Sequence, residues 1–413
     1  MYRLYILNHQ PTVPPFMLSA LKVAVNQFDE VVYINKRIPT NVEAVPDGDC
    51  VKFFELPKRK RVTAYILALF EFFSPKDIGL FIKGVKENGL SFHFLKVFFA
   101  HILYFWSAKS TVESLICSNS KEDKTFVLSG WYGAEALCVS RVKQQIPGIT
   151  AVSLAHSFEI FTSRDPYIQY YFNEEKLKYL DSIYFISKQG YDSFFAEVPG
   201  SNRYIEKASV VYLGTYKDND VLNPLGGNDS FNLCTCSRTI PLKRLDVLCE
   251  ALRLWDSGSI TWTHIGFGED DERLRQLAKK TEAENTRVKI ILKGRLKNEE
   301  VINFYANSSV DLFVNLSTIE GLPISIMEVL SFGIPVIATD VGGTREIVND
   351  KVGLLLPSDI TPMMVKDAIY SYYSKSDVEI AALRTNAFIQ WKTRFNAEHN
   401  FNYLFEKMKG LNS

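Results

Sequence analysis

Two carboxylates eight residues apart stand out in the C-terminal half of the chain. Glu320 follows an apolar run of strand length at 311–316, and Glu328 lies inside a helix predicted to begin at Pro323. At a helix start the backbone N–H groups lack partners and the positive end of the helix dipole favours phosphate. Two carboxylates beside it could accept hydrogen bonds from sugar or ribose hydroxyls. Alternatively, Glu320 only neutralises the helix start.

The helix that carries Glu328 is apolar on nearly every side, which predicts that it is buried. Gly333 and Pro335 follow it, so the helix should end at Phe332. A carboxylate in a buried helix is costly unless it is hydrogen-bonded, and this makes Glu328 a candidate for ligand binding. Alternatively, its side chain reaches solvent or a salt bridge.

A cluster of cations forms a second candidate site. Arg238, Lys243 and Arg244 follow a predicted strand at 231–236 and precede a helix from about residue 245. Arginine can hold a phosphate through two N–H donors, and lysine adds a movable point charge. The cluster therefore predicts a phosphate site. Alternatively, Lys243 pairs with Asp246 or Glu250 on the helix surface.

The order of these residues resembles the signature of the group-1 glycosyltransferases. The resemblance rests on the Glu320–Glu328 spacing, on FGIPV at 332–336 and DVGG at 340–343, and, upstream, on Ser237, Arg238, Pro241, Lys243, Asp246, Gly266, Gly268 and Gly294. It covers residues 205–357 well and the N-terminal half only loosely. It implies the GT-B fold, in which two Rossmann-like doubly wound α/β domains face each other across a cleft. It also implies retaining, metal-independent transfer of a sugar from a nucleoside-diphosphate donor, with no other cofactor.

The resemblance also implies a role for individual residues. Arg238 and Lys243 would bind the diphosphate, Glu320 the donor sugar, and His156 would contact the sugar near the reacting carbon; these four are the predicted catalytic residues. The predicted donor-binding residues are Glu328 on the ribose, the helix start at Gly321, Leu322 and Ile324, Gly294 near the base, and Arg244. The leaving phosphate would act as the base in a front-face reaction. From composition alone, His156 would be a core histidine.

Apolar runs alternate with helical patterns along the chain, as expected for doubly wound α/β domains. The sequence predicts an N-terminal acceptor domain at 1–213, a C-terminal donor domain at 214–387, and a terminal segment at 388–413 with an aromatic helix over 389–408. In proteins that this chain resembles, the last helix crosses back onto the first domain. The loop after the first strand, at 8–15, lacks the glycines that many of these proteins have there.

Charge and cysteine content exclude some functions. Lysine plus arginine equals aspartate plus glutamate, at 47 each, so the global basic excess of a nucleic-acid-binding protein is absent. The six cysteines lack metal-site spacing, and no signal peptide is recognisable at the N-terminus, so we expect no metal and a cytoplasmic location.

Residues 51–110 have an unusual composition, with ten lysines and arginines against four acids. The apolar-aromatic segments at 58–73 and 92–106 are too short or mixed to span a bilayer, which takes about 20 apolar residues. Basic residues beside aromatic helices predict peripheral contact with the anionic inner face of the cell membrane. Alternatively, both segments are core helices of the first domain beside a solvated basic loop.

These features together predict a retaining hexosyl-type glycosyltransferase. Its donor would be a nucleotide sugar and its acceptor a saccharide or a lipid-linked sugar, in bacterial cell-surface polysaccharide or glycolipid assembly. The alternatives are a sugar-nucleotide epimerase of the same fold and a non-catalytic, membrane-associated subunit.

Overall fold

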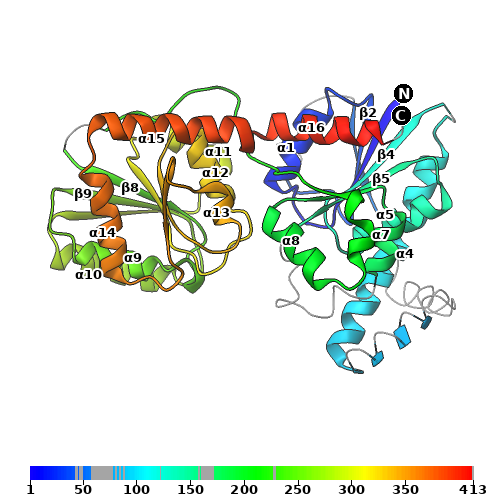
Figure 1. The fold of residues 1–413 in the computed structure, drawn as a ribbon, viewed down its shortest axis with the longest axis horizontal. Helices are drawn as coiled ribbons and strands as arrows, with labels where there is room; N and C mark the ends of the chain where they lie inside the picture. The colour runs from blue at the N-terminus through cyan, green and yellow to red at the C-terminus, as the bar shows by residue number, and fades with distance from the viewer. Residues whose placement is uncertain are drawn as a thin grey trace. The chain divides into compact units, whose positions relative to one another are not determined.

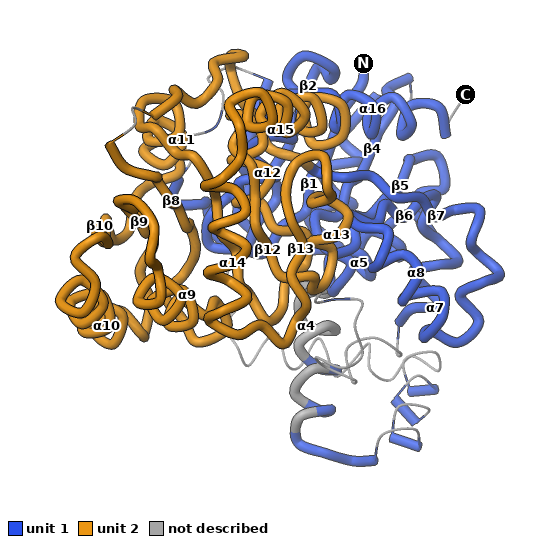
Figure 2. The backbone as a smooth tube through the Cα atoms, turned by 60° about the vertical axis from the view of Figure 1, so that its left-hand side comes forward, with its two compact units in different colours: residues 1–213, 397–413 blue, residues 214–396 orange. Residues whose placement is uncertain are grey.

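The computed structural model describes residues 1–41, 45, 50–56, 78–79, 81–82, 85–86, 89–120, 122–156, 159, 172–226 and 229–411. The chain divides into two compact units (Figure 2). Unit 1 consists of Met1–Leu213 and Ala397–Ser413, and unit 2 of Gly214–Asn396.

Unit 1 is built on a seven-stranded sheet with the strand order β3-β2-β1-β4-β5-β6-β7. Its neighbouring strands are parallel. The elements are β1 (Tyr2–Leu7), α1 (Pro15–Ala24), β2 (Glu30–Asn35), β3 (Val51–Glu55), α4 (Phe92–Cys117), β4 (Lys124–Ser129), α5 (Ala134–Gln145), β5 (Thr150–Ala155), α7 (Asn173–Tyr179), β6 (Ser182–Phe185), α8 (Lys188–Glu197), the 3₁₀ helix η2 (Ser201–Lys207), β7 (Ala208–Val210) and α16 (Ala397–Gly410).

Helices cover both faces of this sheet (Figure 1), which is why its central strands are near-continuous apolar runs. Helices α4, α5, α7 and α8 share one apolar core with the strands. Helices α1 and α16 pack against each other, and the rings of Phe28 and Phe405 lie 5.2 Å apart between their centroids. The last helix of the chain thus completes the first unit.

Unit 2 is built on a six-stranded parallel sheet with the order β10-β9-β8-β11-β12-β13. Its elements are β8 (Phe231–Cys236), the 3₁₀ turn η3 (Pro241–Lys243), α9 (Leu245–Arg253), β9 (Ile260–Ile265), α10 (Asp271–Glu284), β10 (Val288–Gly294), α11 (Asn298–Asn307), β11 (Leu312–Asn315), α12 (Ile324–Ser331), β12 (Val336–Thr339), α13 (Thr344–Ile347), β13 (Gly353–Leu356), α14 (Pro362–Tyr373), α15 (Asp377–Gln390) and the π-helical η4 (Trp391–Phe395).

Both sheets reverse their strand order at one point, between β1 and β4 in unit 1 and between β8 and β11 in unit 2. Each such point opens a crevice at the carboxyl ends of the strands, where doubly wound sheets bind ligands. The predicted class, two doubly wound α/β units with a final helix on the first, is confirmed.

The end of the chain differs from the prediction of one helix over 389–408 and of a boundary at 387/388. Helix α15 ends at Gln390, a π-helical segment follows, and the chain passes to unit 1 between Asn396 and Ala397. The distant Thr215 contacts this segment: its backbone N–H donates to the carbonyl of Phe395 at 2.9 Å, and its Oγ1 accepts from the indole of Trp391 at 2.9 Å.

The two segments with predicted membrane contact are only partly described. Residues 58–73 lie outside the described residues. The segment 92–106 belongs to α4, where Phe94 and Phe98 are buried and Phe92 is 84% exposed. Across the described residues, no helix combines the length and the apolar character that spanning a bilayer requires.

Candidate functional site

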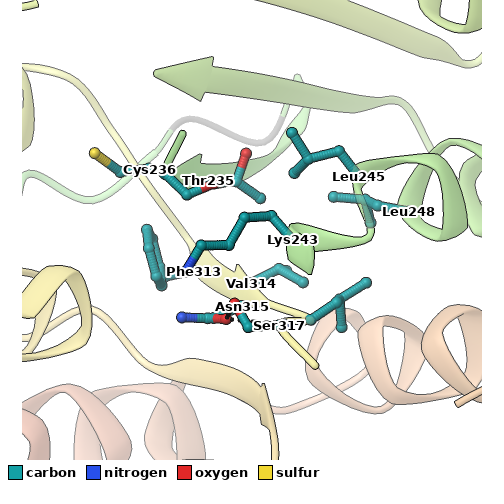
Figure 3. A pocket seen from close by; sticks show the side chains of 11 residues that line it. Thr235, Cys236, Lys243, Leu245, Leu248, Phe313, Val314, Asn315 and Ser317 are labelled. Atoms are coloured by element: carbon teal, nitrogen blue, oxygen red, sulfur yellow. Dashed lines mark hydrogen bonds between the residues drawn. The ribbon is translucent and has the colours of Figure 1, made fainter. Parts of the chain in front are cut away.

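The candidate site of unit 2 lies where its strand order reverses. Strands β8 and β11 are neighbours, with Leu233 opposite Leu312 and Cys234 opposite Phe313. The loops after these two strands carry Lys243 and Glu320. A pocket between the strands is lined by residues from both (Figure 3), and the side chain of Lys243 extends across it.

Lys243 and Glu320 form an ion pair in this pocket. The ammonium Nζ of Lys243 donates to Glu320 Oε1 at 2.5 Å, and both side chains are largely buried. Neither proposed surface partner holds Lys243, because Asp246 pairs with Arg273 and Glu250 with Arg253. The structure therefore brings together two residues that lie 77 positions apart.

Two further polar side chains hold the Glu320 carboxylate. The hydroxyl of Ser317 lies 2.6 Å from Glu320 Oε1, and the Asn315 amide donates to the same oxygen at 3.3 Å. The side chain of Asn315 also accepts from the backbone N–H of Ser317 at 3.1 Å. The sequence analysis did not identify Asn315 and Ser317 as site residues. Their position at the end of β11, just before Glu320, could have indicated it.

Glu328 is the buried member of the site. Its side chain on α12 is 8% exposed, and Oε1 accepts from the amide of Asn298 at 2.8 Å. Burial raises the pKa of the Glu328 carboxyl from 4.5 to about 7, and the Asn298 hydrogen bond opposes that rise. The alternative of a solvent-facing or salt-bridged Glu328 does not match this environment. Asn298, at the start of α11, was not identified from the sequence.

Glycines bring backbone segments of the site close together. Gly342 has φ +56°, and a Cβ there would lie 2.0 Å from the carbonyl oxygen of Glu320. A Cβ on Gly266 would lie 1.7 Å from the carbonyl oxygen of Ser237. Both glycines thus permit contacts that no side chain would allow.

His264 holds the end of β8 and the loop after it through two hydrogen bonds. Its ring nitrogens lie 2.8 Å from Thr235 Oγ1 and 3.1 Å from Thr239 Oγ1. Burial lowers the pKa of His264 to about 4, so its ring is neutral at pH 7. Arg238, between the two threonines, is exposed on this loop.

The remaining predicted donor-binding residues fall into two groups. Gly321, Leu322 and Ile324 lie at the start of α12, whose N-cap residue Pro323 makes no side-chain cap. Gly294 ends β10 with φ +70°, and its carbonyl accepts from Gly266 N at 2.9 Å. The guanidinium of Arg244 is directed elsewhere, donating to the carbonyl of Ser358 at 2.6 Å.

His156 belongs to unit 1 and ends strand β5. It is 6% exposed, its Nε2 lies 3.1 Å from the carbonyl oxygen of Gly130, and its ring packs against Trp131 and Phe16. Because a carbonyl only accepts, Nε2 carries the proton. Burial lowers the pKa of His156 to about 3, so this imidazole is neutral.

Metal ligands do not gather in the described part of the chain, where no three His, Cys, Asp or Glu side chains are placed to hold an ion. The positive charge beside Glu320 comes instead from Lys243. What this arrangement can do is hold an anion against the Lys243 cation, with the Glu320 carboxylate beside it as a hydrogen-bond acceptor.

The model of the family described as "Glycosyl transferases group 1" matches residues 226–387. This region is therefore similar to the group 1 glycosyltransferases. It contains Arg238, Lys243, Glu320 and Glu328, and therefore the whole candidate site of unit 2.

Curated relatives of this chain include the amylovoran biosynthesis glycosyltransferase AmsK of Erwinia amylovora, which is 24% identical over 186 residues. The putative colanic acid biosynthesis glycosyltransferase WcaL of Escherichia coli is 26% identical over 178 residues. The two alignments cover 43% and 41% of this chain, and 44% and 41% of the relatives. The chain thus spans less than half the length of these relatives.

Solved structures resemble the whole chain. Anabaena Alr3699/HepE in complex with UDP superposes with a TM-score of 0.65 at 15% identity, over 99% of this chain and all of that one. The lipopolysaccharide outer core galactosyltransferase WaaB superposes with a TM-score of 0.66 at 16% identity, over 98% and 100%. At this identity the likeness concerns the fold alone, and the predicted GT-B fold is confirmed.

Proposed function

We propose that this chain transfers a hexosyl group from a nucleoside-diphosphate sugar to an acceptor hydroxyl with retention of configuration. The observation that carries the proposal is the Lys243–Glu320 pair at the switch point of unit 2, with Glu328 buried on the helix that follows. Anabaena Alr3699/HepE, which has a similar fold, was solved in complex with UDP and with UDP-glucose, and this supports a nucleotide-sugar donor here.

The diphosphate would be stabilised by three sources of positive charge. Lys243 and Arg238 supply cationic donors, and the start of α12 supplies backbone N–H groups. Negative charge builds up on the departing diphosphate, and fixed donors aimed at that charge lower the barrier without a metal ion. The start of α12 carries no side-chain cap, so its N–H groups remain available to phosphate.

Binding of the donor would exchange the partners of Lys243. In the free protein its ammonium group is held by Glu320. A phosphate oxygen would take over Lys243, and the Glu320 carboxylate, still held by Ser317 and Asn315, would turn to hydroxyls of the donor sugar. Lys243 thus has an anionic partner before and after donor binding, and the Glu320 carboxylate has hydrogen-bond donors in both states.

The other predicted site residues would contact the rest of the donor. Glu328 would accept the ribose hydroxyls, and Gly294 would approach the base. His156 is buried and neutral, so we propose that it contributes a polar contact in the sugar-transfer step rather than a proton transfer. Arg244 remains a proposed donor contact that requires release from Ser358.

We further propose that the acceptor is a saccharide or a lipid-linked sugar of cell-surface polysaccharide or glycolipid assembly, bound by unit 1. The curated names of AmsK and WcaL support this setting. Peripheral contact with the anionic inner face of the cell membrane, through 58–73 and 92–106, belongs to the same proposal. Exposed Phe92 at the start of α4 supports it.

The test is a thermal-shift panel of UDP-glucose, UDP-galactose, UDP-N-acetylglucosamine and GDP-mannose, because a ligand that binds only the folded state raises the melting temperature. Lys243→Ala should abolish the shift, whereas the control Lys280→Ala, on the exposed face of α10, should retain it. A panel without any shift, or an equal shift in both variants, would refute the site. Conversion of the donor to an epimer without acceptor would identify an epimerase instead.

A further inference from the structure

The carboxylate proposed to bind the ribose has one fixed hydrogen bond and one oxygen left over. Glu328 on α12 is 8% exposed, and its Oε1 accepts from the side-chain amide of Asn298 at 2.8 Å. Over the residues that the structure describes, no other group donates a hydrogen bond to this carboxylate. Both oxygens of a carboxylate can accept, so Oε2 is available to a hydroxyl of a ligand.

The amide of Asn298 is held in place by the start of α11. Asn298 is the first residue of this helix. Just before it, the backbone N–H of Lys297 donates to the Glu300 carboxylate at 2.7 Å, and the Lys297 carbonyl accepts from the N–H of Val301 at 3.1 Å. Val301 is buried, which fixes this first turn against the core. The hydrogen bond to Glu328 therefore comes from an ordered helix turn and gives the carboxylate one orientation.

The titratable groups that face Glu328 from neighbouring elements are neutral. They are Cys236 at the end of β8 and Tyr305 on α11. Burial raises the pKa of the Cys236 thiol to about 12 and the pKa of the Tyr305 phenol above its usual range, and the charge of Glu328 adds to both shifts. At pH 7 neither group carries a charge that could offset that of the carboxylate.

Cations on the elements around α12 are engaged with other groups. These are Lys243 with Glu320, Lys217 with the carbonyl of Ser331, Arg384 with the carbonyl of Asn223, Lys392 with Asp220, and Arg394 with the ring of Phe395. Helix α15 and η4, which carry the last three cations, both pack against α12. In the described part of the chain, Glu328 thus has no ion pair.

Asn298 is therefore the group that favours the ionised form of Glu328. Burial raises the pKa of the carboxyl to about 7, and the hydrogen bond from Asn298 opposes this rise. An ionised carboxylate only accepts hydrogen bonds, which suits the two hydroxyls of a ribose, whereas a protonated carboxyl is itself a donor. Without the Asn298 amide, the carboxyl would keep its proton to a higher pH and could turn.

We infer that Asn298 is a positioning residue, which holds Oε1 of Glu328 so that Oε2 of the ionised carboxylate meets the 2′ and 3′ hydroxyls of the donor nucleotide. The inference rests on the proposed function and deepens it, because it assigns to the site a preference for ribonucleotides over deoxyribonucleotides. It concerns residues of unit 2 alone. The preference should be present while Glu328 is ionised and should fade as the pH falls through about 7.

The test measures the affinities of UDP, 2′-deoxy-UDP and 3′-deoxy-UDP by titration calorimetry between pH 5.5 and pH 9. If another nucleotide of the panel shifts the wild type, its diphosphate and the two deoxy forms are used instead. The ratio of the affinities cancels the titration of the phosphates, which all three ligands share. In the wild type, UDP should be favoured by about 10-fold over at least one deoxy form at pH 9, and the ratio should approach one at pH 5.5.

Asn298 is exposed, so its replacement should leave the fold intact, and the melting temperature checks this. Asn298→Ala should bring the ratio at pH 7 close to one and move its rise to higher pH by about one unit, since a hydrogen bond to a charged group is lost. Asn298→Asp has nearly the same shape and should lower the ratio at least as far, because a second ionised carboxylate cannot donate and repels the first. The control Asn307→Ala, at the exposed end of the same helix, should keep the wild-type ratio and pH profile.

A second measurement separates positioning from a merely structural role. In a Glu328→Gln background, Asn298→Ala should have no further effect on the ratio, because the two residues act through one hydrogen bond. A further loss there, an unchanged ratio in Asn298→Ala, or an equal loss of affinity for all three ligands at every pH would overturn the inference. So would a wild type that binds UDP without preferring it to either deoxy form, although the donor site would then stand. A wild type that binds no nucleoside diphosphate would instead overturn the proposed function.

Discussion

Replacing Glu328 by glutamine should stabilise the protein at neutral and alkaline pH. The Glu328 side chain is 8% exposed, and the hydrogen bond from Asn298 only partly offsets the loss of hydration. Burial raises the pKa of the carboxyl from 4.5 to about 7. Glutamine has nearly the same shape, can accept the same hydrogen bond and is never charged, so it removes the cost of the buried anion and little else.

The direction of the pH dependence follows from proton binding. Between pH 4.5 and about 7 the folded state holds a proton at Glu328 that the unfolded chain releases, so the stability of the wild type falls as the pH rises through this window. Below it both states are protonated, and above it the full cost remains. The change in pKa corresponds to about 3 kcal/mol, at about 1.4 kcal/mol for each tenfold change in proton affinity.

The assay is urea unfolding of the full chain between pH 4 and pH 8.5, read by hydrogen exchange in peptides that cover α12. At pH 4, Glu328→Gln and the wild type should unfold at similar urea concentrations. At pH 8.5, the free energy of unfolding of the variant should be higher by about 3 kcal/mol. Glu299→Gln, on the exposed face of α11, is the control and should follow the wild-type trend. A constant difference across the range, or a variant that loses stability as the pH rises, would refute the reasoning.

Three further predictions concern the same unit. UDP affinity should rise as the pH increases through about 7, because ribose hydroxyls donate best to an ionised Glu328; titration calorimetry measures this, and a flat profile would contradict it. Ser317→Ala removes the 2.6 Å contact to Glu320 and should lower turnover about 10-fold with little change in UDP affinity, as steady-state kinetics would show. Gly342→Ala should destabilise the fold by about 2 kcal/mol or more, since its Cβ would lie 2.0 Å from a carbonyl, whereas Gly410→Ala in α16, with open space around it, should not; thermal melts compare the two.

That Lys243 and Glu320 lie close together could be predicted, because the sequence shows where the two strands before them end. Apolar runs at 231–236 and 311–316 mark two parallel strands, and the loops after such strands meet at one edge when the strands are neighbours. The partners of the carboxylates were harder to predict. Asn298 reaches Glu328 across 30 residues, and nothing in the pattern of α11 distinguishes it from an ordinary polar residue near a helix start.

Side-chain direction and helix breaks depend on contacts that no local pattern encodes. Arg244 was placed with the phosphate cations, but its backbone is left-handed, with φ +49°, and its guanidinium reaches Ser358, 114 residues away. The helix expected to continue past Gln390 contains neither glycine nor proline at the break. After the break, the carbonyl of Phe395 accepts from the backbone N–H of the distant Thr215, and the indole of Trp391 donates to the hydroxyl of the same residue.

The two units repeat one design with different chemistry. Each has a basic side chain after its first strand and a glutamate after the neighbouring strand across the switch point: Lys243 with Glu320 in unit 2, and His9 with Glu135 in unit 1. A lysine ammonium ion has three donors and no lone pair, so it suits a phosphate. An imidazole has two ring nitrogens: Nδ1 of His9 contacts Glu135, and Nε2 lies 3.3 Å from the Gln10 amide. The same place in the fold thus carries a lysine–glutamate pair in one unit and a histidine–glutamate pair in the other.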